Sequence, residues 1–251
     1  MGMHRSSLLL AALALACGLA RPSAVDACAR PQVSEELVTP DGASLTSDGG
    51  VITETRFDQD RFSPDEDDKD RIRGFEARAP NGAVLATTGE YIAPMLSVLH
   101  VTSPGSRFDV VRGKTRIRSF TVAKHPELSA PRLASASSTL SASASMAVTK
   151  AKMGGPSGEV SYTLAGEAPT DAYALVLLQI TPTGSLGVAY AHPGPKLKTF
   201  SYPFGGKRCR GGFTGLRQGE RVAAAWLDVH GRLSKPSTTI VVGAPPRPAK
   251  P

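Results

Sequence analysis

The stretch Ala172-Tyr-Ala-Leu-Val-Leu-Leu-Gln-Ile-Thr181 decides the fold of this chain. It contains no charged residue, no Gly and no Pro, and it ends at the turn Pro182-Thr-Gly184. A run of aliphatic and β-branched residues bounded by turn formers predicts a β-strand, and its apolar character indicates a central one.

Short segments around this strand also have strand character. Val160, Tyr162 and Leu164 alternate with polar residues and therefore share one face of a predicted strand. The Ser/Ala-rich stretch 133–147 could be a flexible linker, but we interpret it as weak edge strands because the strands after it need partners. Further strands are predicted at Leu186–Ala191, Leu197–Pro203, Val222–Val229 and Thr238–Val242.

The first half of the chain has the same organisation, with turns such as Asp41-Gly42 and Pro80-Asn-Gly82 between short alternating segments. A polar insertion, 58–73, interrupts it, and Ser63-Pro-Asp-Glu66 within it predicts a short capped helix. Pro126 and Pro131 mark a boundary. The predicted fold class is all-β. We expect two β-sandwich domains, at 33–124 and 128–243, and a disordered Pro-rich tail at 244–251.

Two segments carry a resemblance to known modules. The stretch from Gly219 to Ser234 resembles the closing hairpin of a fibronectin type III or related immunoglobulin-like domain. The first half resembles bacterial immunoglobulin-like modules through Pro40-Asp-Gly-Ala43, Ser103–Phe108 and Arg118–Val122. The resemblance implies sandwich folds and an extracellular binding or spacer role, and such modules have no catalytic residue in common. The polar insertion departs from the usual module.

The N-terminus has the order of a secretory signal peptide. A short basic head, His4-Arg5, precedes the apolar run Leu8–Cys17, which is about half the length needed to cross a bilayer. Small residues allow cleavage after Ala20 or after Ala27, and we prefer Ala27, so that residues 1–27 are removed. In a rival interpretation, Cys17 is lipidated as the anchor of a lipoprotein. No later segment has the length of a transmembrane helix, and we expect an exported protein that is periplasmic, extracellular or attached to the cell envelope.

Export also affects how the cysteines and the charge distribution of the chain are interpreted. Cys28 and Cys209 would remain after cleavage, and an oxidising compartment favours a disulfide between them, although two separate thiols are the alternative. Such a bond would hold the two domains against each other. Residues 28–124 hold 13 basic and 15 acidic residues, whereas residues 125–251 hold 14 basic and 6 acidic. The basic residues are scattered, so we expect a solvated surface and no nucleic-acid partner.

Sites for chemistry are weakly indicated. The best metal candidates are carboxylates of the insertion, which would bind calcium, but their spacing lacks the Gly that a calcium loop needs at its sixth position; these are Asp58, Asp60, Asp65, Asp67 and Asp68. A basic group, Lys207, Arg208 and Arg210, flanks Cys209 and is a candidate contact for a partner or an anion. The chain shows no nucleophile motif and no zinc-spaced His pair, and we expect no cofactor.

Three functions are compatible with these features. The leading hypothesis is a non-enzymatic exported protein whose β-sandwich modules serve protein contact or spacing at the cell envelope. The second is a small-ligand or glycan-binding module, although the single Trp226 on an alternating strand is expected in the core. The third is a secreted hydrolase too divergent to show a motif.

Overall fold

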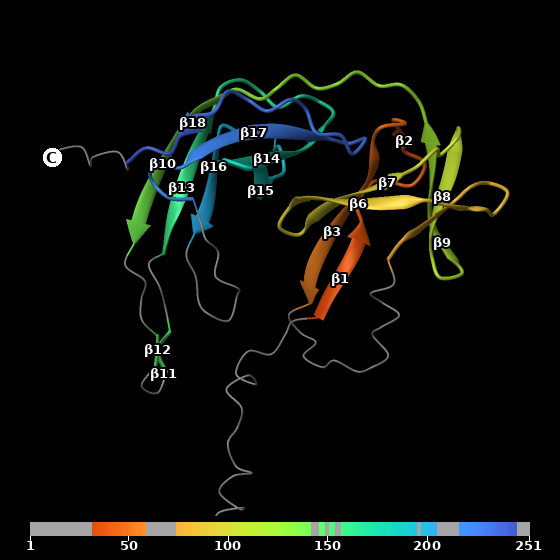
Figure 1. Ribbon diagram of the computed structural model, residues 1–251, viewed down its shortest axis with the longest axis horizontal. Helices are drawn as coiled ribbons and strands as arrows, with labels where there is room; N and C mark the ends of the chain where they lie inside the picture. Colours follow the sequence, from red (N-terminus) through yellow and green to blue (C-terminus); the bar gives the residue numbers. More distant parts are fainter. Residues whose placement is uncertain are drawn as a thin grey trace, which may run out of the picture.

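The computed structural model describes residues 32–58, 74–141, 146–148, 151–153, 157–194, 197–204 and 216–244. Over these ranges the chain forms β-strands, turns and extended segments, and no helix (Figure 1). The all-β prediction is confirmed. In the same ranges, no helix has the length and apolar character that crossing a membrane would require.

Residues 32–122 form a sandwich of two sheets, which we call the N-terminal sandwich. Its sheets have the strand orders β1-β3-β7-β6 and β2-β9-β8-β4-β5, with β2 parallel to β9. Lettered along the chain as A, A′, B, C, C′, D, E, F and G, these sheets read ABED and A′GFCC′, which is immunoglobulin order. The strands are β1 (Gln32–Leu37), β2 (Ser44–Leu45), β3 (Gly50–Asp58), β4 (Glu76–Arg78), β5 (Val84–Leu85), β6 (Thr87–Ala93), β7 (Leu96–Val101), β8 (Arg107–Arg112) and β9 (Thr115–Val122).

Residues 133–243 form the C-terminal sandwich. One sheet has the order β10-β13-β16 and the other β15-β14-β17-β18, and a small hairpin, β11-β12, lies between the first two sandwich strands along the chain. With the same lettering the sheets read ABE and C′CFG, the related arrangement in which C′ joins the CFG sheet. The strands are β10 (Leu133–Ser141), β11 (Met146–Val148), β12 (Ala151–Met153), β13 (Ser157–Leu164), β14 (Ala172–Thr181), β15 (Gly184–Ala191), β16 (Thr199–Phe204), β17 (Arg221–Asp228) and β18 (Ile240–Val241).

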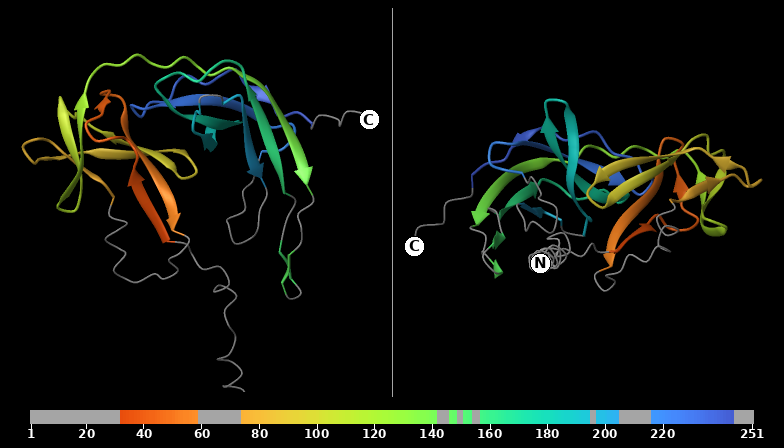
Figure 2. Two further views of the ribbon diagram at one scale, coloured as in Figure 1. Left: turned by 180° about the vertical axis from the view of Figure 1, so that it is seen from behind. Right: turned by 60° about the horizontal axis from the view of Figure 1, so that its bottom comes forward.

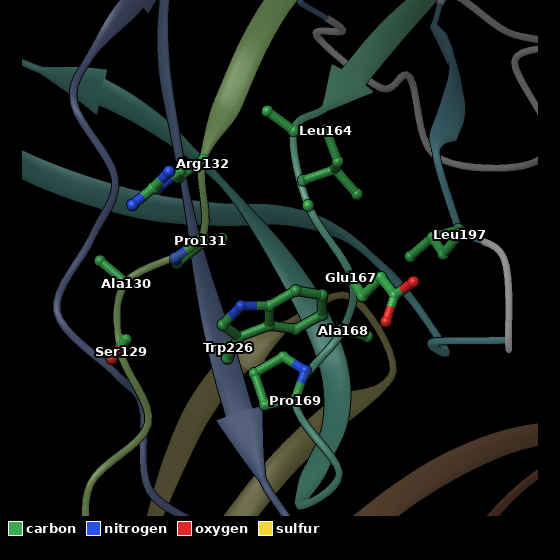
Figure 3. A pocket seen from close by; sticks show the side chains of 12 residues that line it. Ser129, Ala130, Pro131, Arg132, Leu164, Glu167, Ala168, Pro169, Leu197 and Trp226 are labelled. Atoms are coloured by element: carbon green, nitrogen blue, oxygen red, sulfur yellow. The ribbon is translucent and has the colours of Figure 1, made fainter.

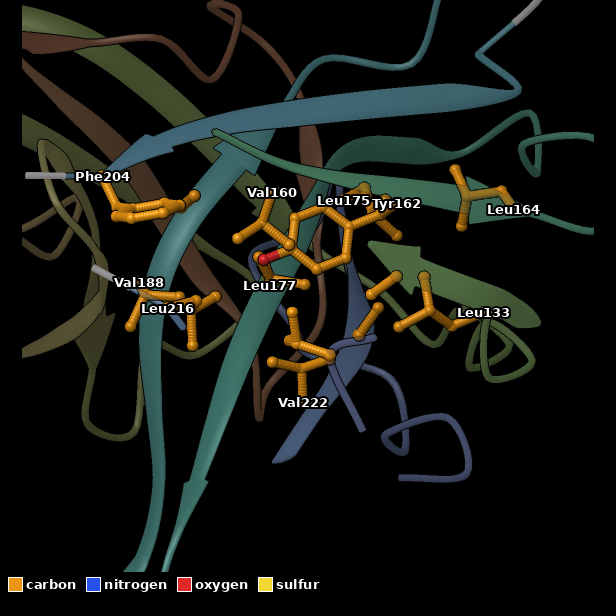
Figure 4. Packing of buried hydrophobic residues seen from close by; sticks show 14 of the residues in the cluster. Leu133, Val160, Tyr162, Leu164, Leu175, Leu177, Val188, Phe204, Leu216 and Val222 are labelled. Atoms are coloured by element: carbon orange, nitrogen blue, oxygen red, sulfur yellow. The ribbon is translucent and has the colours of Figure 1, made fainter. Parts of the chain in front are cut away.

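Each sandwich has its own apolar core. In the N-terminal sandwich Phe108 and Phe120 are in contact, with ring centroids 5.4 Å apart, and both are buried. In the C-terminal sandwich the predicted face of β13, Val160, Tyr162 and Leu164, is buried against Leu175 and Leu177 of β14 (Figure 4). Alternation along the strand therefore predicted this core correctly.

The Ser/Ala-rich stretch is an edge strand, as expected. β10 pairs only with β13 among the described strands of its sheet, and a bridge between Ser137 and Gly243 connects it to the last strand region. The last strand is shorter than predicted, because only Ile240 and Val241 pair with β17. Residues 123–132 form an extended linker without strand pairing, which runs above both sandwiches in Figure 1.

The two sandwiches lie next to each other, and strands of both contribute to a shared apolar interface. In the views of Figures 1 and 2 the two sandwiches lie beside each other, with sheet β1-β3-β7-β6 on the side toward sheet β15-β14-β17-β18. Buried apolar side chains from both sheets form a third cluster between them. In the described ranges, the four sheets of the two sandwiches therefore enclose three apolar clusters, one inside each sandwich and one between them.

Candidate functional site

The third cluster, which we call the junction core, explains the composition of the central strand. Along β14, Leu175 and Leu177 point into the C-terminal sandwich, whereas Ala174, Val176 and Leu178 point into the junction core. Successive residues of a strand point to opposite faces, so a strand that is buried on both faces is apolar throughout. The continuous run at 172–181 therefore reflects packing between the sandwiches as well as within one of them.

β17 has the same double burial. Val222, Ala224 and Trp226 belong to the C-terminal core, and the intervening side chains belong to the junction core. All seven residues from Val222 to Asp228 are buried. Small alanines on the junction side let the opposing sheet approach closely.

The N-terminal sandwich presents a complementary face. Ile52 of β3 and Val98 of β7 point into the junction core and are at most 1% exposed, while their neighbour Val51 belongs to the N-terminal core. Ile92, Ala93 and Leu96, around the β6-β7 turn, complete the face. The junction is therefore an apolar core of the kind found inside domains, and it restricts movement of one sandwich against the other.

Glycines allow backbone contact across the junction. A Cβ atom on Gly187 of β15 would collide with the carbonyl oxygen of Ile92, and one on Gly231 would collide with the carbonyl oxygen of Gly50. Gly231 also has a φ of 80°, a conformation that side chains disfavour. Both positions therefore require glycine for close approach.

The turn after β17 binds the N-terminal sandwich by hydrogen bonds. The Gly50 amide donates to the His230 carbonyl over 3.0 Å, and His230 Nδ1 donates to the Ser44 carbonyl over 2.7 Å. The His230 ring stacks on His125 of the linker, with centroids 3.8 Å apart and planes 15° apart. His125 Nε2 lies 3.0 Å from Ser44 Oγ. Linker, β2 and the β17-β18 connection thus meet at one point.

A buried ion pair supports this meeting point. Asp228, 2% exposed, accepts from the amides of His230 and Arg232 and pairs with the Arg232 guanidinium. Arg232 also donates to the carbonyls of His125, over 3.1 Å, and Pro126, over 2.7 Å. One guanidinium therefore holds the linker against the C-terminal sandwich.

A polar cluster crosses the junction at another place. Glu54 of β3 accepts from the Tyr173 hydroxyl over 2.7 Å, and its Oε1 lies 3.2 Å from His192 Nε2. The His192 ring contacts Tyr173 and Tyr190 edge-on. This cluster consists of an acid, an imidazole and phenols, but its contacts bind one sandwich to the other.

Burial raises the pKa of two tyrosines of the C-terminal sandwich, Tyr162 and Tyr202. Desolvation raises the pKa of the Tyr162 phenol, with smaller contributions from Tyr202 and Glu220. The Tyr162 hydroxyl is buried without a hydrogen-bond partner in the structure. Desolvation also raises the pKa of Tyr202, and Tyr91 of the N-terminal sandwich adds to this effect.

A recess of about 280 Å³ opens at one end of the C-terminal sandwich (Figure 3). Linker residues 129–132 and residues 164–169 border it, and the Trp226 indole lies between Pro131 and Pro169. Trp226 is only 5% exposed, so its ring offers little open face for stacking on a sugar. The expectation that Trp226 is a core residue is confirmed, and the recess gives the glycan alternative little support.

The site residues predicted from the sequence lie almost entirely outside the described ranges. This applies to the signal peptide with Cys17, to Cys28 and Cys209, to the basic residues Lys207, Arg208 and Arg210, and to the insertion, including Asp60, Asp65, Asp67 and Asp68. Asp58 ends β3, but its side chain is outside the described part. Within that part, no group of three or more His, Cys, Asp and Glu side chains could hold a metal ion.

The junction contacts were not predicted from the sequence. The one available signal was the unbroken apolar character of β14 and β17, because a strand with one solvated face alternates.

Comparisons with known proteins identify no family for this chain. No family model matches it, and no curated protein matches it. Among solved structures it is similar to the FN1–FN3 domains of chicken CNTN1, at 9% identity and a TM-score of 0.29, over 86% of this chain and 69% of that chain. A superposition this loose carries no argument, and the assignment of an immunoglobulin-like fold rests on the strand orders given above.

Proposed function

We propose that this chain is a non-enzymatic exported protein in which two β-sandwiches act as one rigid body for protein contact or spacing at the cell envelope. The junction core carries the proposal. A spacer transmits position only if its modules keep their relative orientation, and burying both faces of β14 and β17 provides this rigidity.

Apolar side chains on the rim of the junction support a contact role. Tyr91 is 56% exposed and Leu186 is 48% exposed. The Tyr91 hydroxyl donates to the carbonyl of Gly187, next to Leu186, over 3.4 Å. Tyrosine is enriched among the residues that dominate the binding energy of protein interfaces, which makes Tyr91 a candidate anchor for a protein partner.

The rigid body is tested by small-angle X-ray scattering of the full chain and of the variant Val176→Asp. Val176 is fully buried in the junction core, so an aspartate there leaves an unpaired charge that drives the sandwiches apart. We expect a larger radius of gyration with the β-sheet circular dichroism retained. Val84→Asp is the matched control, because Val84 is 59% exposed and lies away from the junction core. Equal dimensions for wild type and Val176→Asp would reject the proposal.

Export is tested by the intact mass of the protein recovered outside the cytoplasm, with and without reductant. Cleavage after Ala27 predicts a chain that begins at Cys28, and lipidation of Cys17 predicts a heavier chain that begins at Cys17. A Cys28–Cys209 disulfide predicts a mass increase of about two protons on reduction. Export would be contradicted if the protein were recovered only from the cytosolic fraction and its mass showed that residues 1–27 were still present.

A further inference from the structure

We infer that the junction responds to pH through the stacked pair His125–His230, whose joint protonation weakens the contact between the β17-β18 turn and β2. The inference rests on the proposed function only in assuming that the two sandwiches are held together in solution. Four of the five histidines of the chain contact the junction or its adjoining turns.

The geometry of the stacked pair disfavours a positive charge on both rings at once. His230 is 9% exposed, and its Nδ1 donates to a carbonyl, so the neutral ring carries its proton on Nδ1. A single protonation still allows a cation to stack on a neutral ring. Protonation of both rings places two like charges with ring centroids 3.8 Å apart, and this arrangement is repulsive.

The surroundings do not compensate a second positive charge. Asp228, which accepts from the His230 amide, is already engaged by the Arg232 guanidinium. Arg232 itself binds the His125 carbonyl and adds a further positive charge. From the other side β2 offers the Ser44 carbonyl and hydroxyl. Lys124 and Glu127 flank His125 in the linker and have opposite charges.

Two other histidines, His192 and His100, have contacts that favour the protonated ring. His192 has Glu54 Oε1 at 3.2 Å from Nε2 and the Tyr173 carbonyl at 3.2 Å from Nδ1. His100 has Glu90 Oε2 at 2.6 Å from Nε2 and the Gly49 carbonyl at 3.2 Å from Nδ1. Both nitrogens of each ring face acceptors, and only the imidazolium donates from both. Protonation of His192 therefore strengthens the contact with Glu54 across the junction, whereas protonation of His100 strengthens contacts within the N-terminal sandwich only.

Acidification thus acts with opposite signs at two places on β3. Gly50 contacts the His230 turn and Glu54 contacts His192, four residues farther along. At about 3.4 Å per residue these contacts are about 14 Å apart. A weaker contact at Gly50 combined with a stronger contact at Glu54 rotates one sandwich relative to the other about Glu54. The two sandwiches stay in contact during this rotation.

The test is amide hydrogen exchange of the full chain at about pH 8 and about pH 5, the range over which histidines titrate, corrected for the intrinsic exchange rate. The Gly50 amide reports directly, because it donates to His230 across the junction. The Val229 amide is the internal control, because it donates to Asp171 within the C-terminal sandwich. We expect protection of Gly50 to fall about tenfold at the lower pH and protection of Val229 to change less than about twofold.

Two variants test which histidines cause the loss of Gly50 protection at the lower pH. His125→Phe keeps a stacked ring without a titrating group, so protection of Gly50 should become independent of pH. His192→Gln, at the other end, should leave the loss at Gly50 in place.

The outcomes separate this inference from the proposed function. Strong protection of Gly50 that is equal at both pH values, or an equal loss in His125→Phe, overturns the inference and leaves the rigid body intact. A Gly50 amide without protection at either pH overturns both, because the junction is then not formed.

Discussion

Asp228 and Arg232 form an ion pair in which Oδ2 lies 2.9 Å from Nη2, and only 3% and 11% of the two side chains are exposed. The same two residues fix the turn at His230 and the carbonyls of the linker. The pair therefore connects three segments that are far apart in the sequence or belong to different parts of the fold.

Asp228→Ala should lower the free energy of unfolding by about 3–5 kcal/mol, since it leaves a buried guanidinium and two amides without their acceptor. Urea unfolding followed by circular dichroism measures this loss. Glu76→Ala is the matched control, because its pair with Arg78 is exposed, at 43% and 39%, and should contribute about 0–1 kcal/mol. Equal losses in the two variants would show that the Asp228 pair is not buried in solution.

Gly187→Ala should destabilise the junction by about 1–3 kcal/mol, because the added methyl group meets the backbone of Ile92. The change is read from the unfolding midpoint and from the radius of gyration. Gly89→Ala is the control, since a Cβ there meets nothing within 4 Å. An unchanged midpoint for Gly187→Ala would mean that β15 does not lie against β6.

Tyr162→Phe should raise the free energy of unfolding by about 1 kcal/mol, because it removes a buried hydroxyl that has no partner and keeps the ring. Differential scanning calorimetry gives the shift in Tm. Tyr162→Ala should instead cost about 3–5 kcal/mol through the cavity it leaves. A lower Tm for Tyr162→Phe would reveal a hydrogen bond made by the hydroxyl in solution.

The burial of the Tyr162 phenol also leads to a prediction about the stability of the fold at high pH. Burial raises the pKa of Tyr162 above the ordinary value of about 10, so the folded state resists its ionisation. This contribution to stability is complete below about pH 10 and is lost as the pH rises through the folded-state pKa, because the unfolded state then releases the proton first. Wild type should therefore lose stability above about pH 10 more steeply than Tyr162→Phe, as urea titrations at several pH values would record. Parallel curves would count against burial of the phenol.

Alternation along β13 predicted one buried face of the C-terminal sandwich. Val160, Tyr162 and Leu164 lie on one buried face, as their spacing indicates, and the Ser/Ala-rich stretch forms an edge strand, β10, that pairs with β13. The limits of the final strand were less predictable, since only Ile240 and Val241 pair.

The junction was beyond prediction from pattern alone. An apolar run such as 172–181 reads as a central strand, whether its second face is covered by the same domain or by another. The stack of His125 on His230 joins residues more than one hundred positions apart, and no local spacing reports it. Gly231 reads as a turn residue, and its close approach to Gly50 depends on how two sheets meet.

Double burial of β14 and β17 has a consequence for how this gene can change. A module strung on a flexible linker can be duplicated, deleted or exchanged alone, because its surface is complete without its neighbours. Here, removing residues 32–122 would expose Ala174, Val176 and the junction side of β17 to water. The two sandwiches are therefore a single unit of inheritance, and recombination that separates them yields a half with an uncovered sheet that tends to aggregate.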